Sequence, residues 1–304
     1  MAAQRILVVG GNGFVGSAVC KQAILRGWDV LSISSSGRPF RTPKGHAPDW
    51  TQSKQMEWHK ADAFQPSDYR DLIAGCTGVV HTMGILLESQ YKGSDGSLAG
   101  IVQGLAKGWG FGSQGNPLKE DAVTYEKMNR DSALAVASTY AETQRAKHNC
   151  EMPFVYLSAA DIMRPLISPR YISTKREAEI GIAKIAEQEQ PPTLRSVCLR
   201  PGLMYHPHTR PWSTVPATLL DASHYLHKQH KKWKVPVPSP ADVLSSKATP
   251  EALRPMSAAL TTPPLHVDTV AQAVCEAIDL DSVRGALDVD TIRQLAGWPG
   301  GLDD

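Results

Sequence analysis

Short apolar segments alternate with amphipathic segments of about ten to fifteen residues along the first two hundred residues of the chain. This alternation is typical of repeated strand–helix–strand units, in which each apolar segment is a buried strand of a parallel sheet. A helix is expected at about 15–26 and another, longer one at about 121–147. The six predicted strands are 5–10, 29–34, 56–62, 78–84, 154–159 and 195–201.

The pattern changes in two places. Residues 93–116 are rich in glycine and too long for an ordinary connection, so we expect a lid or a disordered loop. Proline and histidine are frequent in 205–264, which we expect to be irregular, before a last helix at about 267–279. The predicted fold class is therefore α/β, with a Rossmann-type doubly wound parallel sheet in 1–201. A smaller C-terminal substrate or interaction lobe is expected in 202–304, with its last helix packed back on the sheet.

The turn after the first predicted strand carries the sequence GGNGFVG at residues 10–16. The first glycine permits a tight turn, the second lets the backbone approach a pyrophosphate, and the third lets the following helix pack on the strand. The amides at the start of that helix are suited to phosphate. The turn therefore predicts a dinucleotide site formed by Gly10, Asn12, Gly13, Phe14, Val15 and Gly16.

The end of the second predicted strand indicates which dinucleotide is bound. NAD-selective sites place a carboxylate there for the ribose hydroxyls, whereas this chain has Ser34, followed by Arg38. A carboxylate would repel a 2′-phosphate, while a hydroxyl and a guanidinium can bind one, so NADP(H) is favoured over NAD(H). The alternative interpretation is that Arg38 is a solvated loop residue.

Two further candidates for cofactor contact follow the next two predicted strands. Asp62 is placed to hold the adenine amino group, and its alternative role is a helix cap. Gly84 would let the backbone pass close to the cofactor, and its alternative role is an ordinary turn.

In this order of strands and helices, several segments resemble the extended or atypical branch of the short-chain dehydrogenase/reductase superfamily, the NAD-dependent epimerase/dehydratase-like proteins. They include TYEKMNRDSA at 124–133, YLSAAD at 156–161, RYISTKREAE at 170–179 and CLRPGLMY at 198–205. The stretch from YLSAAD to RYISTKREAE is most similar to fungal mitochondrial proteins of the ubiquinone-synthesis complex, to which the nucleotide-binding accessory subunit of respiratory complex I is related. The resemblance implies the matrix side of the inner mitochondrial membrane and coenzyme Q production, although the N-terminal residues show no evident presequence.

The resemblance implies roles for several residues at a reaction centre. In the superfamily, the tyrosine that Tyr171 matches donates a proton, while the lysine that Lys175 matches binds the nicotinamide ribose and lowers the pKa of the tyrosine. Their spacing of four residues places both on one helix face. Asn129 matches an asparagine that supports a water chain to the lysine, or else is an ordinary helix-surface amide. Pro201, in CLRPGLMY, completes the expected cofactor contacts.

One catalytic group departs from the family pattern. A hydroxyl that hydrogen-bonds the substrate oxygen is expected at the end of the fifth strand, where YLSAAD places Ala160. Ser158 faces the same side of the strand two residues earlier and is a candidate substitute, as are Ser173 and a water molecule. Losing such a donor typically costs about 10²-fold or more in rate, so the sequence leaves turnover open.

Composition narrows the classes of protein. A net charge of +2 gives no indication of nucleic-acid binding, and no long uninterrupted apolar run is present that would span a bilayer. The cysteines are odd in number and lack CxxC spacing, which favours reduced thiols over a disulfide framework. They stand at positions 20, 76, 150, 198 and 275.

The segment 224–234, HYLHKQHKKWK, raises two further hypotheses. Its histidines drift across a helix face and no cysteine or carboxylate completes a zinc shell, so no metal site is expected. Its lysines beside Trp233 are typical of a surface that meets an anionic membrane, and the alternative is a solvated, charged helix face. Leu105, Trp109 and Phe111 in the glycine-rich segment are a second candidate for apolar contact, with a lid packed on the protein as the alternative.

Three functions are consistent with these features. The first is an NADP(H)-binding oxidoreductase-like protein of ubiquinone synthesis, in which a quinone-like intermediate enters beside residues 203–212. Its partners would be other ubiquinone-synthesis proteins and the inner-membrane surface. The second, motivated by Ala160, is a non-catalytic nucleotide-binding scaffold or assembly subunit of a membrane-associated complex. The third is a nucleotide-sugar epimerase or dehydratase, which Ala160 and the short loop before Tyr171 disfavour.

Overall fold

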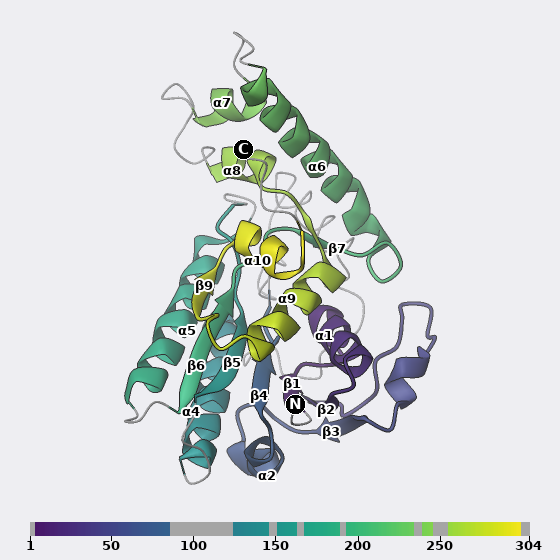
Figure 1. Ribbon diagram of the computed structural model, residues 1–304, viewed down its shortest axis with the longest axis vertical. Helices are drawn as coiled ribbons and strands as arrows, with labels where there is room; N and C mark the ends of the chain where they lie inside the picture. The colour runs from purple at the N-terminus through teal and green to yellow at the C-terminus, as the bar shows by residue number, and fades with distance from the viewer. Residues whose placement is uncertain are drawn as a thin grey trace.

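A seven-stranded parallel sheet forms the centre of the protein (Figure 1). The computed structural model describes residues 4–85, 124–145, 151–162, 167–188, 193–233, 239–245 and 255–298. The strand order β3-β2-β1-β4-β5-β6-β9 confirms the predicted doubly wound α/β class. The strands are β1 (Arg5–Val9), β2 (Asp29–Ser34), β3 (Met56–Lys60), β4 (Gly78–His81), β5 (Met152–Leu157), β6 (Leu194–Leu199) and β9 (Gly285–Leu287).

Helices cover both faces of this sheet (Figure 1). One face carries α1 (Phe14–Leu25), α9 (Val267–Asp279) and α10 (Val289–Leu295). The other carries α2 (Arg70–Ala74), α4 (Ser132–Gln144) and α5 (Pro169–Gln188). Short 3-10 turns lie at Asp49–Gln52 and Pro66–Asp68, and a π-helical segment, Glu126–Asp131, precedes α4.

The central strands explain why the sequence shows continuous apolar runs. On β5, Val155 and Leu157 belong to the core beneath α1 and α9, whereas Phe154 and Tyr156 belong to the core beneath α4 and α5. Successive strand residues point to opposite faces, so a strand buried on both faces requires apolar residues at every position. The four described cysteines, Cys20, Cys76, Cys198 and Cys275, are free and buried.

The late segment of the chain returns to the sheet. The helix predicted at about 267–279 is confirmed as α9, and β9 pairs with β6 from Val197↔Gly285 to Leu199↔Leu287. Strand β9 was not predicted, because three residues are too few to show an alternating pattern. The sheet thus takes its last strand from the part of the sequence assigned to the smaller lobe.

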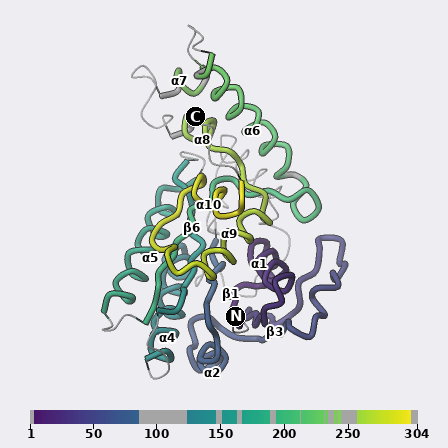
Figure 2. Tube along the Cα trace, in the orientation of Figure 1, coloured from purple at the N-terminus to yellow at the C-terminus, as the bar shows by residue number. Residues whose placement is uncertain are grey.

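A second group of elements lies beyond the carboxyl ends of the strands, at one end of the molecule (Figures 1 and 2). It comprises α6 (Pro211–Lys232), α7 (Pro240–Ser245), α8 (Pro255–Thr261) and the two-stranded parallel sheet of β7 (Met204–Tyr205) and β8 (Leu265–His266). The expectation of irregular chain was wrong for the first half of α6, where prolines obscured the helical pattern, whereas the charged helix considered for 224–234 is present as far as Lys232. Among the described helices, none combines the length and apolar character needed to cross a bilayer.

The glycine-rich stretch 93–116, with Leu105, Trp109 and Phe111, lies outside the described residues, as do Cys150 and Lys234.

A buried arginine joins the late segment to the sheet. Arg195 on β6 is 2% exposed and donates hydrogen bonds to the carbonyl oxygens of Ala277 (2.8 Å), Ile278 (3.0 Å) and Val283 (2.6 Å). Two of these carbonyls lie at the C-terminal end of α9, where the helix dipole favours a cation. Burial lowers the pKa of Arg195, and these acceptors hold the guanidinium in place of water.

Arg195→Met should therefore lower the free energy of unfolding by about 2–4 kcal/mol, because buried carbonyl oxygens lose their donors. Urea denaturation of the purified protein measures the change. The matched control is Arg284→Met, whose side chain is 61% exposed and pairs with Glu151 at the surface, and which should change stability by less than about 1 kcal/mol. Equal effects of the two substitutions would contradict this account of Arg195.

Candidate functional site

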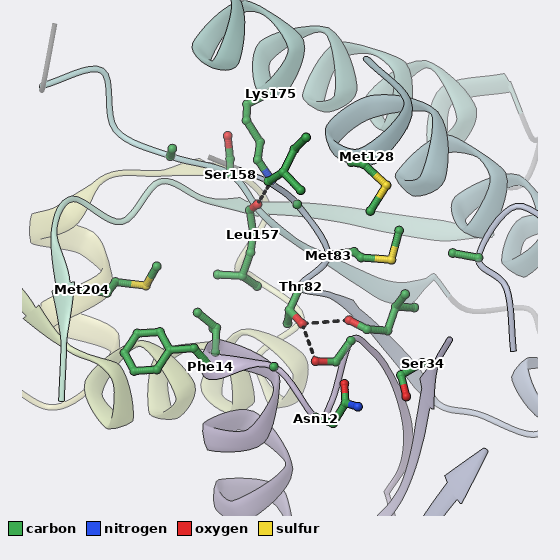
Figure 3. A pocket seen from close by; sticks show the side chains of 18 of the residues that line it. Asn12, Phe14, Ser34, Thr82, Met83, Met128, Leu157, Ser158, Lys175 and Met204 are labelled. Atoms are coloured by element: carbon green, nitrogen blue, oxygen red, sulfur yellow. Dashed lines mark hydrogen bonds between the residues drawn. The ribbon is translucent and has the colours of Figure 1, made fainter. Parts of the chain in front are cut away.

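A cavity of about 660 Å³ opens at the carboxyl ends of the strands. It lies where the strand order reverses between β1 and β4, which is the usual ligand position in an open α/β sheet. Its volume is within the range of small-molecule and cofactor sites. Figure 3 shows side chains from several strand ends and from α5 converging on it.

Most of the predicted site residues line this cavity. The exceptions are Gly16, Arg38 and Asn129, each of which contacts a residue that does line it. The predicted residues in the lining are Gly10, Asn12, Gly13, Phe14, Val15, Ser34, Asp62, Gly84, Ser158, Tyr171, Lys175 and Pro201.

The glycine turn leaves room for a phosphate group. Gly10 has φ +82°, and a Cβ at Gly16 would lie 2.2 Å from the Gly10 carbonyl oxygen, so α1 packs this closely on the turn only because position 16 is glycine. Gly13 is the N-cap of α1 and has no side chain to cap the first amides of the helix. Such amides bind anionic phosphate, so a dinucleotide pyrophosphate fits this turn.

The end of β2 differs in part from the sequence prediction. Ser34 lines the cavity together with Ser35 and Lys60, whereas the exposed Arg38 does not line it. The Arg38 carbonyl oxygen accepts a hydrogen bond from Asn12 Nδ2 at 3.4 Å. Lys60, which pairs in register with Ser34, was missed because it is the last residue of a polar edge strand and no motif marks it. A hydroxyl and an ammonium group, with no carboxylate at the end of β2, suit a 2′-phosphate.

Asp62 lines the cavity and also shapes its own loop. Its Oδ1 accepts the Phe64 N–H at 3.0 Å, and its N–H donates to Asp68 Oδ2 at 3.0 Å. The two interpretations of Asp62, a turn-forming residue and a residue at the cofactor cavity, are therefore compatible.

Tyr171 and Lys175 lie one turn apart on α5 and both line the cavity. The Tyr171 ring packs edge-on against Tyr125, with 6.0 Å between ring centroids. Lys175 is 3% exposed, and its Nζ donates to the Leu157 carbonyl oxygen at 2.8 Å and lies 4.7 Å from the centroid of the Tyr156 ring (Figure 3). The pair predicted from sequence is thus brought together at the end of β5.

Burial dominates the acid–base properties of this pair. It lowers the pKa of Lys175 to about 7, against the opposing charge of Glu179. It raises the pKa of Tyr171 above its ordinary value, an effect that nearby Tyr125 strengthens and Arg176 opposes. At neutral pH the phenol therefore retains its proton, and the lysine is close to its point of half-protonation.

Gly84, which has no side chain, lies close to both Lys175 and Asn129. A Cβ at Gly84 would lie 2.9 Å from Lys175 Nζ and 2.8 Å from Asn129 Oδ1. Asn129 is fully buried in the π-helical segment, so it is not a helix-surface amide. Its side chain accepts the Ile85 N–H at 2.9 Å and donates to the Ile85 carbonyl oxygen at 3.3 Å. Asn129 thereby fixes the backbone beyond β4 next to the lysine.

Ser158 is held in an ionic network that sequence reasoning did not identify. Its hydroxyl donates to Glu179 and accepts from Arg176 at 3.0 Å. Glu179 also pairs with Arg200; burial raises the pKa of this carboxyl, but hydrogen bonds from Arg200 and Ser158 outweigh it and lower the pKa. The Ser158 proton is therefore committed to a carboxylate, while Ala160 lines the cavity without a hydroxyl.

The remaining lining is largely apolar. Met83 and Met128 lie on one side of the cavity, and Met204 and Phe14 lie on another (Figure 3). The Arg210 guanidinium stands 3.9 Å from the centroid of the Phe14 ring, and burial lowers the pKa of Arg210 to about 10. Arg210 was also missed from sequence, since it is close to Phe14 only in the folded protein. Ile162, Ile167 and Leu203 also belong to the apolar part.

In the part of the chain that the structure describes, histidine, cysteine and carboxylate side chains form no cluster of three or more suited to a metal ion. His224 Nδ1 instead contacts the Thr261 carbonyl oxygen, and His227 Nδ1 contacts Ser239 Oγ at 2.7 Å. Each of these histidines thus joins α6 to a neighbouring segment.

Residues 6–93 match the NAD dependent epimerase/dehydratase family. MIOREX complex component 2 of Saccharomyces cerevisiae is 35% identical over 212 residues, which cover 67% of this chain and 74% of that protein. An uncharacterized chloroplastic protein of Arabidopsis thaliana is 28% identical over 295 residues, covering 96% of this chain and 77% of that protein.

Solved structures share the fold at low identity. An oxidoreductase of the short chain dehydrogenase/reductase family from Burkholderia thailandensis has a TM-score of 0.55 and 14% identity, covering 96% of this chain and 93% of that chain. MoeE5 in complex with UDP-glucose and NAD has a TM-score of 0.53 and 15% identity, covering 96% of this chain and 81% of that chain.

Lys175→Met should make the protein more stable than the wild type at pH 7, by about 1–3 kcal/mol. The folded state holds the pKa of Lys175 at about 7 against 10.5 for a free lysine, so between these values the unfolded chain binds more protons. Wild-type stability therefore rises with pH across this window, and the advantage of Lys175→Met should shrink towards pH 10. Urea unfolding at several pH values measures the difference.

The control for this series is Lys60→Met, because Lys60 is an exposed lysine of the same cavity. Because the Lys60 ammonium is exposed to water, Lys60→Met should not give the stabilisation at pH 7 that is expected of Lys175→Met. A Lys175→Met protein that is less stable at pH 7, or whose advantage does not vary with pH, would show that the ammonium is not penalised by burial.

Proposed function

Since the chain belongs to the NAD dependent epimerase/dehydratase family, we propose that it is an NADP(H)-dependent oxidoreductase acting on an apolar, quinone-like intermediate of ubiquinone synthesis. The observation that carries the proposal is the placement of Tyr171 and Lys175 at one cavity, which the glycine turn and Met83, Met128 and Met204 also line.

The cavity suits a nicotinamide dinucleotide along its length. The turn at Gly10 and the start of α1 would receive the pyrophosphate, with the Arg210 guanidinium beside Phe14 as a further cation. Ser34 and Lys60 would receive a 2′-phosphate, which is the basis for proposing NADP(H) over NAD(H). When bound, the cofactor supplies or accepts the hydride.

Tyr171 and Lys175 perform the remaining chemistry. The raised pKa of Tyr171 keeps the phenol protonated, so it is a proton donor to a carbonyl oxygen that becomes an alcohol. Lys175, which donates to the Leu157 carbonyl oxygen, lies within the same cavity and would donate to the ribose hydroxyls. Its amine would be more strongly protonated beside a phosphate-bearing ligand, since negative charge raises its pKa.

The lining favours an apolar substrate. Met83, Met128 and Met204 offer flexible, polarizable surfaces that adapt to flat rings, and Ile162 and Ile167 add branched apolar surface. A nucleotide sugar would need convergent polar groups for its hydroxyls, which these residues do not supply. This end of the cavity therefore supports a quinone-like ring over a sugar.

We also propose that the protein lies in an organelle and has protein partners. The yeast relative is named as a component of a complex, and the Arabidopsis relative is named as chloroplastic, which supports an organellar protein with protein partners. The resemblance to fungal ubiquinone-synthesis proteins extends this to the matrix side of the inner mitochondrial membrane, among other proteins of that pathway.

A second candidate is a nucleotide-binding scaffold without turnover. Ala160 supplies no hydroxyl at the cavity, and the Ser158 hydroxyl donates to Glu179. A protein that needed the dinucleotide only for stability would retain the glycine turn and Lys175 while losing this donor.

Tyr171→Phe separates the two candidates. It removes the proton donor and keeps the ring against Tyr125, so NADPH affinity should stay within about threefold, while NADPH oxidation by a short-chain ubiquinone analogue should fall by about 10²-fold or more. Cells that carry this variant should lose ubiquinone. Tyr225→Phe, at an exposed tyrosine on α6, is the matched control and should change neither readout. Normal ubiquinone levels with Tyr171→Phe would favour the scaffold.

A further inference from the structure

Helix α6 has one face that is packed and one that is open. His224 contacts the carbonyl oxygen of Thr261 at the end of α8, His227 contacts Ser239 ahead of α7, and Ala217 is 1% exposed, so these three residues mark the packed face. The helix runs along the outer edge of this end of the molecule (Figures 1 and 2).

The open face carries large apolar side chains in a row. Val215 is 61% exposed, Leu219 68%, Leu226 66% and Trp233, just after the last helical residue, 73%. Their spacings of four and seven residues place them on one side of a helix, opposite His224. An exposed row of this kind marks an interaction surface.

Positive charge accompanies the second half of this row. Residues 222–234 contain four lysines and no carboxylate, and Trp233 stands between two of those lysines in the sequence. Leucine and tryptophan on one face of a helix, with lysines on the rest, are typical of helices that lie in the interface of a bilayer. The three lysines of α6, Lys228, Lys231 and Lys232, are followed by a fourth in the sequence, and such a basic cluster matches anionic headgroups.

We propose that α6 and Trp233 form a docking surface for an anionic phospholipid bilayer, with Leu219, Leu226 and Trp233 entering the headgroup region. This inference deepens the proposed function and rests on it for the membrane-dissolved substrate. The helix lies on the bilayer and does not cross it, since its apolar row is narrow and interrupted by polar residues such as Gln229.

A second copy of the chain is a poorer occupant of this surface. In the sequence of α6 the one carboxylate, Asp221, is outnumbered by Lys228, Lys231 and Lys232, so a second copy packed antiparallel does not balance the charge of the lysine-rich half. Parallel helices would place Lys232 against Lys232, which is repulsive. Anionic headgroups supply the opposite charge that neither arrangement provides.

Docking by α6 would bring the cavity to the bilayer. The helix begins at Pro211, and both Met204 and Arg210, shortly before it, line the cavity. A hydrophobic substrate could then enter from the membrane beside Met204 without crossing water.

Sedimentation of the full-length protein with vesicles tests the apolar part of this surface. The wild type should bind mixed vesicles that contain equal amounts of phosphatidylglycerol and phosphatidylcholine. It should bind vesicles of pure phosphatidylcholine far more weakly. The double variant Leu219→Asp/Leu226→Asp should weaken binding at least about tenfold, because two inserting side chains become charged. Leu25→Asp on α1, at a leucine 69% exposed, is the matched control and should bind as the wild type does.

Charge reversal tests the electrostatic part. Lys228→Glu/Lys232→Glu should reduce binding to the anionic vesicles by more than about tenfold, and added salt should weaken wild-type binding. Lys44→Glu/Lys54→Glu, at exposed lysines away from α6, should have little effect.

Absence of wild-type binding to the anionic vesicles, or equal losses in the α6 and control variants, would overturn the proposal. A wild-type dimer that forms without lipid, and that the Leu219→Asp/Leu226→Asp protein cannot form, would also overturn it, because the apolar row would then be a contact between two copies of the chain. NADPH titration of the same variants keeps the two proposals separate: the α6 variants should retain wild-type cofactor affinity, whereas failure of the proposed function would remove cofactor binding from the wild type itself.

Discussion

The burial of the Lys175 ammonium is the constraint around which the site is built. One hydrogen bond to the Leu157 carbonyl oxygen and the face of the Tyr156 ring replace water around the charge. Lys175 and Asn129 both approach Gly84 so closely that a side chain at position 84 would collide with them. A charge so placed costs stability, and a buried cation that lines a cavity together with Tyr171 is the kind of perturbed group that functional sites contain.

The same constraint links the layers of the fold to the cavity. Lys175 and Tyr171 come from α5 on one face of the sheet, and the glycine turn leads into α1 on the other. Arg210, on the approach to α6, reaches Phe14 and so connects the smaller group of elements to that turn. A dinucleotide in the cavity would touch residues of all three parts.

Sequence reasoning succeeded where a signal was local. The glycine turn, the two-sided apolar strands and the Tyr171–Lys175 spacing each depend on neighbouring residues, and the sheet and cavity agree with them. It failed where partners are distant: Lys60 reaches the cavity by pairing beside Ser34, and Ser158 meets Arg200 only through Glu179. Arg38 is close to Ser34 in sequence, but it does not line the cavity, so its predicted contact with a cofactor stays a prediction.

The central claim is that this cavity is an NADP(H) site arranged around Lys175. The most direct measurement is a fluorescence titration of the purified wild-type protein with NADPH and with NADH. The account predicts saturable one-to-one binding of both, with NADPH bound more tightly and with an advantage that shrinks when Lys60 is replaced by glutamate. No binding of either dinucleotide would contradict the account.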